Sequence, residues 1–281
     1  MEQHVITSEQ IMAYRARLLN EEKGSGTVEK YLRDVEGLAA WLDGEAATKE
    51  RLAAWKDVLL RRGLAPVTVN SMLAAVNSFL RFAGWEDCRV KFLKLQRRLF
   101  RDESRDLSKA EYDRLVSTAE RLGRERLALL LETICATGIR VSEVRYVTVE
   151  AAERGKAEIS LKGKIRTILL PGKLCRKLLK YARKNKTASG EIFLTRNGTG
   201  LSRRQIWAEM KALCAEAGVE AGKVFPHNLR HLFARTFYHV CRDVAKLADV
   251  LGHSSIETTR IYLISTGAEH ARTLERLGLV V

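Results

Sequence analysis

Apolar residues in the first hundred positions recur at intervals of three and four, the spacing of one face of an α-helix. This spacing predicts helices over residues 8–22, 27–44, 48–63 and 65–85. The clearest apolar face comprises Val28, Tyr31, Leu32, Val35, Leu38 and Leu42. Gly44 and Gly63 are placed to end two of these helices. Pro66 falls in the first turn of the fourth, where its missing N–H removes no helical hydrogen bond.

Short polar residues indicate where these helices begin. Ser8, Thr27 and Thr48 stand before acidic residues at spacings that suit N-caps. The aromatic residues expected in the core of this half are Trp41, Trp55, Phe79 and Phe82. The first half is therefore predicted to be a bundle of about four helices.

A charge-dense stretch over residues 101–106 predicts a linker, and we place the domain boundary there, giving domains 1–102 and 103–281. Ser108 follows the linker, with Glu111 three residues later, which is the pattern of a capping box at a helix start.

The second half combines two hydrophobic periods. The run "ERLALLLETICATG" predicts a buried helix that ends at Gly138. Residues 156–172 alternate and carry β-branched side chains on either side of a Lys-Gly-Lys turn, which predicts a β-hairpin. Further helices are predicted over residues 173–185, 202–218, 227–240, 242–252 and 255–265. The chain is thus predicted to be mainly α, with a second domain that is mostly helical and contains a small antiparallel sheet.

Composition narrows the class of protein. The 281 residues are 46% hydrophobic, enough for the cores of two domains. No apolar run is long enough to span a membrane, and the first residues lack the pattern of a signal peptide, so we expect no membrane partner. The five cysteines are scattered singly, without a C-x-x-C pair. Their spacing argues against a zinc site or a disulfide framework and suits a reducing cytoplasm.

Charge points to a polyanionic partner. The formal net charge is +15, and it is uneven: residues 1–100 carry 16 basic and 13 acidic side chains, whereas residues 101–281 carry 33 and 21. Lysine and arginine neutralise phosphates and release condensed counterions, so a basic second half favours nucleic acid. A generically basic protein is the alternative, and composition does not distinguish DNA from RNA.

Several polar groups stand out against this background. His227, Arg230 and His231 share one face of an otherwise apolar helix, where they face either a ligand or solvent. Arg140 follows the helix-ending glycine, where it either binds phosphate or forms a local ion pair with Glu143.

In chain order, "ATGIRVSEV", the lysine-bearing hairpin, "HNLRH", "LGHSS" and "TTRIY" resemble the tyrosine recombinase (phage integrase) family, and most closely its compact, Xer-like members. The family pattern is Arg, Lys, His-x-x-Arg, His or Trp, and Tyr. Its positions are matched by Arg140, Lys162, His227, Arg230, His253 and Tyr262. The first half is similar to the SAM-like core-binding domain of the family in length and helix pattern.

The resemblance implies a mechanism. Tyr262 would attack a DNA phosphate to form a 3′-phosphotyrosine link, while Arg140 and Arg230 hold the nonbridging oxygens and His253 adds a hydrogen bond to the phosphate. A 5′ hydroxyl from a partner strand would then reverse the step. Neither ATP nor a metal or other cofactor is expected.

The remaining roles concern proton transfer and support. His227 would accept the tyrosine proton. Lys162 would protonate the departing 5′ oxygen, with Lys164 as the alternative because both lie in the hairpin turn. Glu143 and His231 are expected to support the site without reacting.

The resemblance also implies the partners. A core-binding and a catalytic domain would close around double-stranded DNA, with contacts expected from Thr68, Asn70, Arg81, Arg203, Arg204 and Gln205. The enzyme would work in the cytoplasm, at the nucleoid when acting, as a tetramer on two DNA sites through a Holliday junction, alone or with a paralogous recombinase or accessory proteins. The tail residues expected to dock on the neighbouring subunit, or in cis, are Leu274, Leu277, Leu279 and Val280.

Two alternatives share these features. One is a type IB topoisomerase, which uses similar chemistry without exchanging partners; the helical first domain and the compact size favour the recombinase. The other is a DNA-binding accessory protein that has lost catalysis, and the presence of all six polar positions argues against it.

Overall fold

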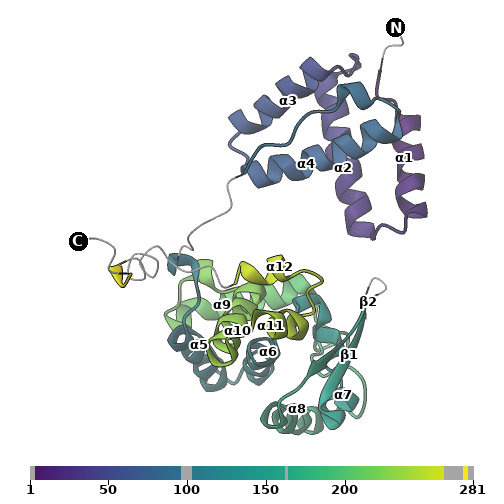
Figure 1. Ribbon diagram of the computed structural model, residues 1–281. Helices are drawn as coiled ribbons and strands as arrows, with labels where there is room; N and C mark the ends of the chain where they lie inside the picture. The colour runs from purple at the N-terminus through teal and green to yellow at the C-terminus, as the bar shows by residue number, and fades with distance from the viewer. Residues whose placement is uncertain (1–3, 96–102, 162–163, 263–274, 278–281) are drawn as a thin grey trace. The chain divides into compact units, whose positions relative to one another are not determined.

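The computed structural model describes residues 4–95, 103–161, 164–262 and 275–277 (Figure 1). The chain forms two compact units, Met1–Arg97 and Arg98–Val281. Their division and the boundary predicted from the sequence both fall near residues 96–102, outside the described residues. Each unit is described by itself.

The first unit consists of four α-helices and one 3-10 helix: α1 Ser8–Asn20, α2 Ser25–Leu42, α3 Lys49–Arg61, α4 Pro66–Phe82 and η1 Glu86–Cys88. The four predicted helices are confirmed. Trp55 and Phe79 are buried in the core, and Trp41 and Phe82 pack against it while partly exposed.

Two of the predicted helix caps in this unit are wrong. Thr48 does cap α3, but α1 is capped by Thr7. The Thr7 hydroxyl accepts from the N–H of Gln10, and the Gln10 side chain accepts from the N–H of Thr7, which forms a capping box. Ser8 is consequently the first helical residue. The N-cap of α2 is Gly24, so Thr27 lies inside its first turn. A spacing to a following acid does not by itself show which residue has left the helical conformation.

The segment after η1 is held to α4 by two asparagines. Asn70 donates from its amide to the carbonyl of Leu93 (2.9 Å) and accepts from the N–H of the same residue (2.8 Å). Asn77 forms the equivalent pair with Val90. The segment after η1 has no regular secondary structure, so these two amides supply the hydrogen-bond partners that its backbone N–H and carbonyl groups would otherwise find in a helix or sheet.

The second unit contains most of the helices and the only sheet among the described residues (Figure 1). Its α-helices are α5 Lys109–Arg121, α6 Glu125–Thr137, α7 Val149–Arg154, α8 Gly172–Lys184, α9 Arg203–Ala217, α10 Pro226–Cys241, α11 Val244–Leu251 and α12 Ile256–Arg260. The strands are β1 Lys156–Leu161 and β2 Lys164–Leu169, and the 3-10 helices are η2 Glu103–Arg105, η3 Val141–Tyr146 and η4 Ala221–Lys223.

The predicted β-hairpin is confirmed. Its strands are antiparallel and pair Ile159 with Arg166. The capping box of Ser108 with Glu111 and the left-handed cap at Gly138 are confirmed as well. Helix α7 and η3 were not predicted, because each spans only six residues and is too short to display a helical period. Helix α12 ends at Arg260, and the end of the predicted segment lies outside the described residues.

The last residues of the predicted linker are part of the second unit. Arg235 of α10 donates to the carboxylate of Asp106 (3.1 Å) and to the carbonyl of Leu107 (2.7 Å). Asn228 donates to the carbonyl of Arg105 (2.9 Å). Residues 105–106 are therefore fixed to α10 by polar partners that lie more than a hundred positions away in the sequence.

Helix α10 crosses the buried helix α6 in the core of this unit. Its polar face is thereby brought to the end of α6. Among the described helices, none has both the length and the apolar composition needed to cross a bilayer.

Candidate active site

The centre of the site is Arg230, a buried cation only 2% exposed. Its guanidinium donates to the carbonyls of Gly138 and of Leu251, the latter at 2.8 Å. These carbonyls belong to the C-terminal ends of α6 and α11, where no helical N–H is available to them. The buried charge is thus matched to unsatisfied backbone acceptors at two helix ends, which also carry partial negative charge.

The turn after α11 gathers further arginines. Gly252 ends the helix in the left-handed conformation, at φ +62°. Its carbonyl accepts from Arg140 at 3.4 Å, and the Leu251 carbonyl accepts from both Arg166 and Arg230. Three guanidiniums therefore converge on two consecutive carbonyls.

Glu143 is the carboxylate that accompanies this cluster. It is 3% exposed, and it accepts from the guanidinium and from the backbone N–H of Arg140, at 2.9 and 2.8 Å. Arg166 of β2 donates to the same carboxylate at 2.5 Å. The local Arg140–Glu143 ion pair is therefore present, and it orients the arginine without removing it from solvent, since the Arg140 side chain is 40% exposed.

A pocket of about 720 Å³ opens beside these groups. The polar side chains that line it include Arg140, His227 and Arg230, together with Arg203 and Arg204 from α9. Trp207, which is 52% exposed, contributes an aromatic wall. Cations from three separate elements thus face one cavity, an arrangement suited to a phosphate or another anion.

His253 is held in a defined tautomer. A guanidinium can only donate, so the 3.0 Å contact between Arg230 and Nε2 of His253 makes that nitrogen the acceptor. The proton then lies on Nδ1, which donates to the hydroxyl of Thr259 at 2.8 Å. Burial and the neighbouring arginines lower the pKa of His253 to about 4, so the ring is neutral near pH 7.

The same causes act on the other groups of the cluster. Burial, followed by the charges of Arg230 and Arg140, lowers the pKa of His227. Burial and Arg140 lower the pKa of Arg230 to about 10, against an opposing effect of the Tyr262 phenol. At neutral pH Arg230 therefore remains cationic while the lowered pKa values of His227 and His253 favour uncharged rings, so His227 is able to accept a proton.

Tyr262 lies among the three histidines. Its ring centroid is 4.4 Å from that of His231, 5.7 Å from that of His253 and 5.9 Å from that of His227. The side chain is 2% exposed, packs in a small apolar cluster with Leu247 and Leu251, and does not line the pocket. The tyrosine is therefore adjacent to the cationic cluster but covered.

Of the residues proposed as catalytic, the fold brings together Arg140, His227, Arg230, His253 and Tyr262, with Glu143 and His231 beside them. Lys162 lies outside the described residues. Lys164 begins β2, and only its backbone is described.

The residues expected to contact DNA fall into two groups: some are simply exposed, and others already form hydrogen bonds within the protein. Arg203, Arg204, Thr68 and Arg81 are exposed. The amide of Asn70 is already paired with Leu93, so its hydrogen bonds are used within the first unit. Gln205 is exposed, and its side-chain oxygen accepts from the N–H of Ser202 in the capping box that begins α9. In both cases sequence inspection missed a structural use of the amide.

Sequence analysis also missed Arg166, Thr259 and Trp207. Arg166 offered one signal: it is a charged residue that alternates with the outward residues Ile165 and Thr167 on a half-buried strand. Thr259 offered none, because its role depends on a histidine six residues away.

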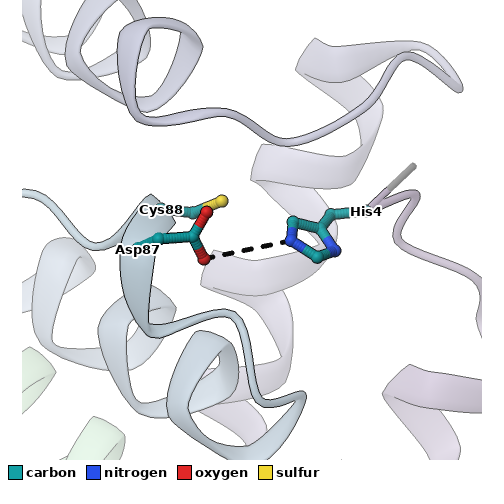
Figure 2. A group of neighbouring side chains, drawn as sticks. All are labelled: His4, Asp87 and Cys88. Carbon is teal, nitrogen blue, oxygen red and sulfur yellow. Dashed lines mark ion pairs between the residues drawn. The ribbon is translucent and has the colours of Figure 1, made fainter. Parts of the chain in front are cut away.

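One further group of ligand-type side chains lies in the first unit: His4, Asp87 and Cys88, whose ligand atoms are within 4.8 Å of one another (Figure 2). The Cys88 thiol donates to the carbonyl of Ala47, and burial raises its pKa to about 11. The His4 ring stacks on Trp85 at 4.8 Å. Metal binding needs a thiolate, and these contacts favour a neutral thiol that ties η1 to Ala47, whose N–H in turn donates to the carbonyl of His4.

Comparison with known proteins agrees with this geometry. The phage integrase family matches residues 105–269, and the N-terminal SAM-like domain of phage integrases matches residues 11–87. This chain belongs to the phage integrase family. The similar proteins include tyrosine recombinase XerC of Roseiflexus castenholzii, 30% identical over 91% of this chain and 88% of that protein. Tyrosine recombinase XerA of Pyrococcus furiosus is 27% identical over 100% of this chain and 98% of that protein. The chain is therefore a tyrosine recombinase of the Xer type.

Solved structures support the fold. XerH site-specific recombinase, bound to its difH substrate in a pre-cleavage complex, matches with a TM-score of 0.69 and 19% identity, over 95% of this chain and 84% of that one. A lambda integrase dimer bound to a core site matches with a TM-score of 0.72 and 16% identity, over 91% and 94%. The recombinase thus has the mostly helical, two-part architecture predicted from its sequence.

Proposed function

We propose that this recombinase cleaves and rejoins duplex DNA with Tyr262 as the nucleophile, at a phosphate held in the pocket by Arg140 and Arg230. The observation that carries the proposal is the convergence of both arginines and His227 on one cavity beside the Tyr262 ring. Guanidiniums oriented in advance stabilise the charge that develops on the phosphorane-like transition state. They do so without reorganising at the moment of reaction.

The imidazoles supply proton acceptance and orientation. His227 takes the phenol proton, which its lowered pKa permits at neutral pH. A hydrogen bond from His253 to the phosphate requires the proton on Nε2, whereas the contact with Arg230 places it on Nδ1. The Thr259 hydroxyl serves either tautomer because it both donates and accepts. Rotation of that hydroxyl therefore accompanies DNA binding.

Departure of the 5′ oxygen requires an acid, and we assign this role to Lys162, with Lys164 as the alternative. The product is a 3′-phosphotyrosine link that conserves the energy of the phosphodiester. Because Tyr262 is only 2% exposed, its hydroxyl has to become accessible to the phosphate before attack.

DNA is positioned by the exposed basic residues around the pocket. Arg203 and Arg204 line it from α9 and are suited to phosphates or to base edges in the major groove. In the first unit, Thr68 and Arg81 are the exposed candidates. The structurally similar XerH site-specific recombinase is bound to its difH substrate, which supports the choice of partner.

The complete reaction pairs two DNA sites in a tetramer and passes through a Holliday junction, in the cytoplasm at the nucleoid, with or without a paralogous recombinase or accessory proteins. The domains that close on DNA are 1–102 and 103–281. Leu277, the described member of the predicted docking tail, is 55% exposed and so offers an apolar contact to another subunit.

The nucleophile is tested by covalent trapping. A binding site is first selected from random duplexes with the Tyr262→Phe variant, and a duplex nicked near that site is then incubated with each protein. We expect wild type to form an adduct that survives boiling in detergent and that retains a label on the 3′-phosphate side of the break. Tyr262→Phe is expected to form none. Tyr238→Phe, which alters a partly buried tyrosine of the same apolar cluster, is the matched control and is expected to react normally.

An adduct formed by Tyr262→Phe, or attached through a 5′ phosphate, would contradict the proposal. Loss of the adduct in Tyr238→Phe as well would show that the cluster, rather than the phenol, is being tested.

A further inference from the structure

Arg166 occupies a position in the site that the family pattern does not contain. It projects from β2, its side chain is 15% exposed, and it does not line the pocket. It donates to the Glu143 carboxylate and to the Leu251 carbonyl. Both acceptors belong to segments that are far from β2 in the sequence.

Each of these acceptors also binds a proposed catalytic arginine. Glu143 holds the guanidinium and the backbone N–H of Arg140. The Leu251 carbonyl accepts from Arg230 at 2.8 Å. Arg166 thus shares one hydrogen-bond acceptor with Arg140 and another with Arg230.

The fit around Arg166 is tight. A Cβ atom added at Gly252 would lie 2.5 Å from the Cδ of Arg166 and 2.6 Å from one of its terminal nitrogens. The arginine therefore packs directly against the turn that joins Leu251 to His253. Because the strand pairing of Ile159 with Arg166 fixes the backbone behind it, the side chain connects a rigid hairpin to this turn.

We propose that Arg166 is a positioning residue, which sets the orientation of Arg140 through Glu143 and that of Arg230 through the Leu251 carbonyl. The inference rests on the proposed function. A planar guanidinium reaches two acceptors on separate segments in a fixed geometry, which a lysine ammonium does not reproduce. The arginine does not touch the DNA; it keeps two phosphate-binding groups at the spacing that the transition state requires.

The test compares single-turnover cleavage on three versions of the selected nicked duplex. The first has an ordinary phosphodiester. The second has a methylphosphonate, which removes the negative nonbridging oxygen that the arginines bind. The third has a 5′-bridging sulfur, whose departure needs no acid. The variants are Arg166→Met, Arg166→Lys and the matched control Arg154→Met, which alters an exposed arginine just before β1.

We expect Arg166→Met to cleave the phosphodiester about 100-fold more slowly than wild type, since small misplacements of catalytic groups have effects of this size. DNA affinity, measured in the Tyr262→Phe background, should change much less. On the methylphosphonate the loss should shrink to less than about tenfold, because the misplaced arginines then have less charge to stabilise. Arg166→Lys should resemble Arg166→Met, and Arg154→Met should resemble wild type.

Other outcomes overturn the inference. An equal loss on all three substrates would indicate a structural role alone. Rescue by the sulfur substrate but not by the methylphosphonate would mean that Arg166 acts on the hairpin lysine instead. If circular dichroism shows that Arg166→Met is not folded, the cleavage rates of Arg166→Lys on the three substrates are compared with those of wild type instead. Failure of wild type to form an adduct would reject the proposed function, whereas wild-type rates in Arg166→Met would reject only this inference.

Discussion

Both units of this recombinase hydrogen-bond polar side chains to backbone groups, but they use these side chains in opposite ways. In the first unit, Asn70 and Asn77 each satisfy the N–H and the carbonyl of one backbone residue on the segment after η1. In the second unit, Arg140 and Arg230 bind carbonyls at helix ends and also line a pocket. The asparagine amides pair with the protein's own backbone, whereas the two arginines also line a cavity.

The difference shows what separates a polar group used within the protein from one that is available to a ligand. An asparagine amide presents matched donors and acceptors, and a single extended segment consumes them. A guanidinium only donates, and its donors are forked, so carbonyls can hold one side while the other meets an anion. Hydrogen bonding to the backbone does not by itself distinguish these asparagines from these arginines. What distinguishes them is that the arginines also line the pocket.

The largest effect is expected where the cavity-facing group is replaced. Arg230→Lys should lower the rate of single-turnover cleavage by about 10³-fold, since the three donors of an ammonium sit on one nitrogen and cannot replace a planar guanidinium that meets two carbonyls, His253 and a phosphate. The rate is measured on the nicked duplex at saturating protein, with circular dichroism to confirm folding. A loss below about tenfold would remove Arg230 from the catalytic group and weaken the contrast between the units.

A smaller effect is expected from Gly252→Ala. The new methyl group would meet Arg166 at 2.5 Å, in a residue whose φ of +62° already disfavours a side chain. Displacement of the turn should slow cleavage by about 10- to 100-fold.

Gly218→Ala is the matched control for this substitution, because Gly218 has φ +58° and nothing lies within 4 Å of its added methyl group. It should lose about 1 kcal/mol of stability and no activity per folded molecule. Equal rates for the two variants would show that contact with Arg166 has no catalytic consequence.

The third prediction concerns the first unit. Asn77→Ala leaves the N–H and the carbonyl of Val90 without their partner, which should lower the free energy of unfolding by about 1–3 kcal/mol. Cleavage per folded molecule should be unchanged. Urea unfolding and the nicked-duplex assay together check this, and a variant that is stable but inactive would place Asn77 among the functional groups.

The smallest effect concerns pH. The pKa of His253 in the folded state, about 4, lies below the usual value near 6.5, so the unfolded chain binds the proton more readily. This contribution to stability is complete above about pH 6.5 and is lost as the pH falls toward 4. The lowered pKa of His227 acts in the same direction.

Unfolding midpoints measured between pH 7 and pH 5 should therefore fall less steeply in His253→Gln than in wild type. This window lies above the range in which carboxylates such as Glu111, whose pKa is lowered by its backbone and lysine contacts, begin to contribute. Identical slopes would mean that burial and the neighbouring arginines do not hold His253 neutral.

The sequence allowed much of this to be predicted wherever the information was local. Periodicity identified the four helices of the first unit, and alternation identified the β-hairpin. The motif order identified the residues that meet at the site. Local patterns did less well with caps, since Ser8 and Thr27 had the right spacing and the wrong backbone conformation.

Other features depended on contacts between distant segments. The Asn70 amide is paired with the backbone of Leu93, and the side-chain oxygen of Gln205 accepts from the N–H of Ser202, neither of which the sequence indicated. The role of Arg166 exists only because Glu143 and Leu251 meet beside β2. By itself, the sequence determined the helices and the hairpin, because these follow from short-range periodicity, and its ordered motifs predicted which polar residues would gather around the pocket. Only the tertiary structure decided which polar groups are consumed by the protein and which face the pocket, because that depends on which backbone acceptors the fold leaves unpaired and where they lie.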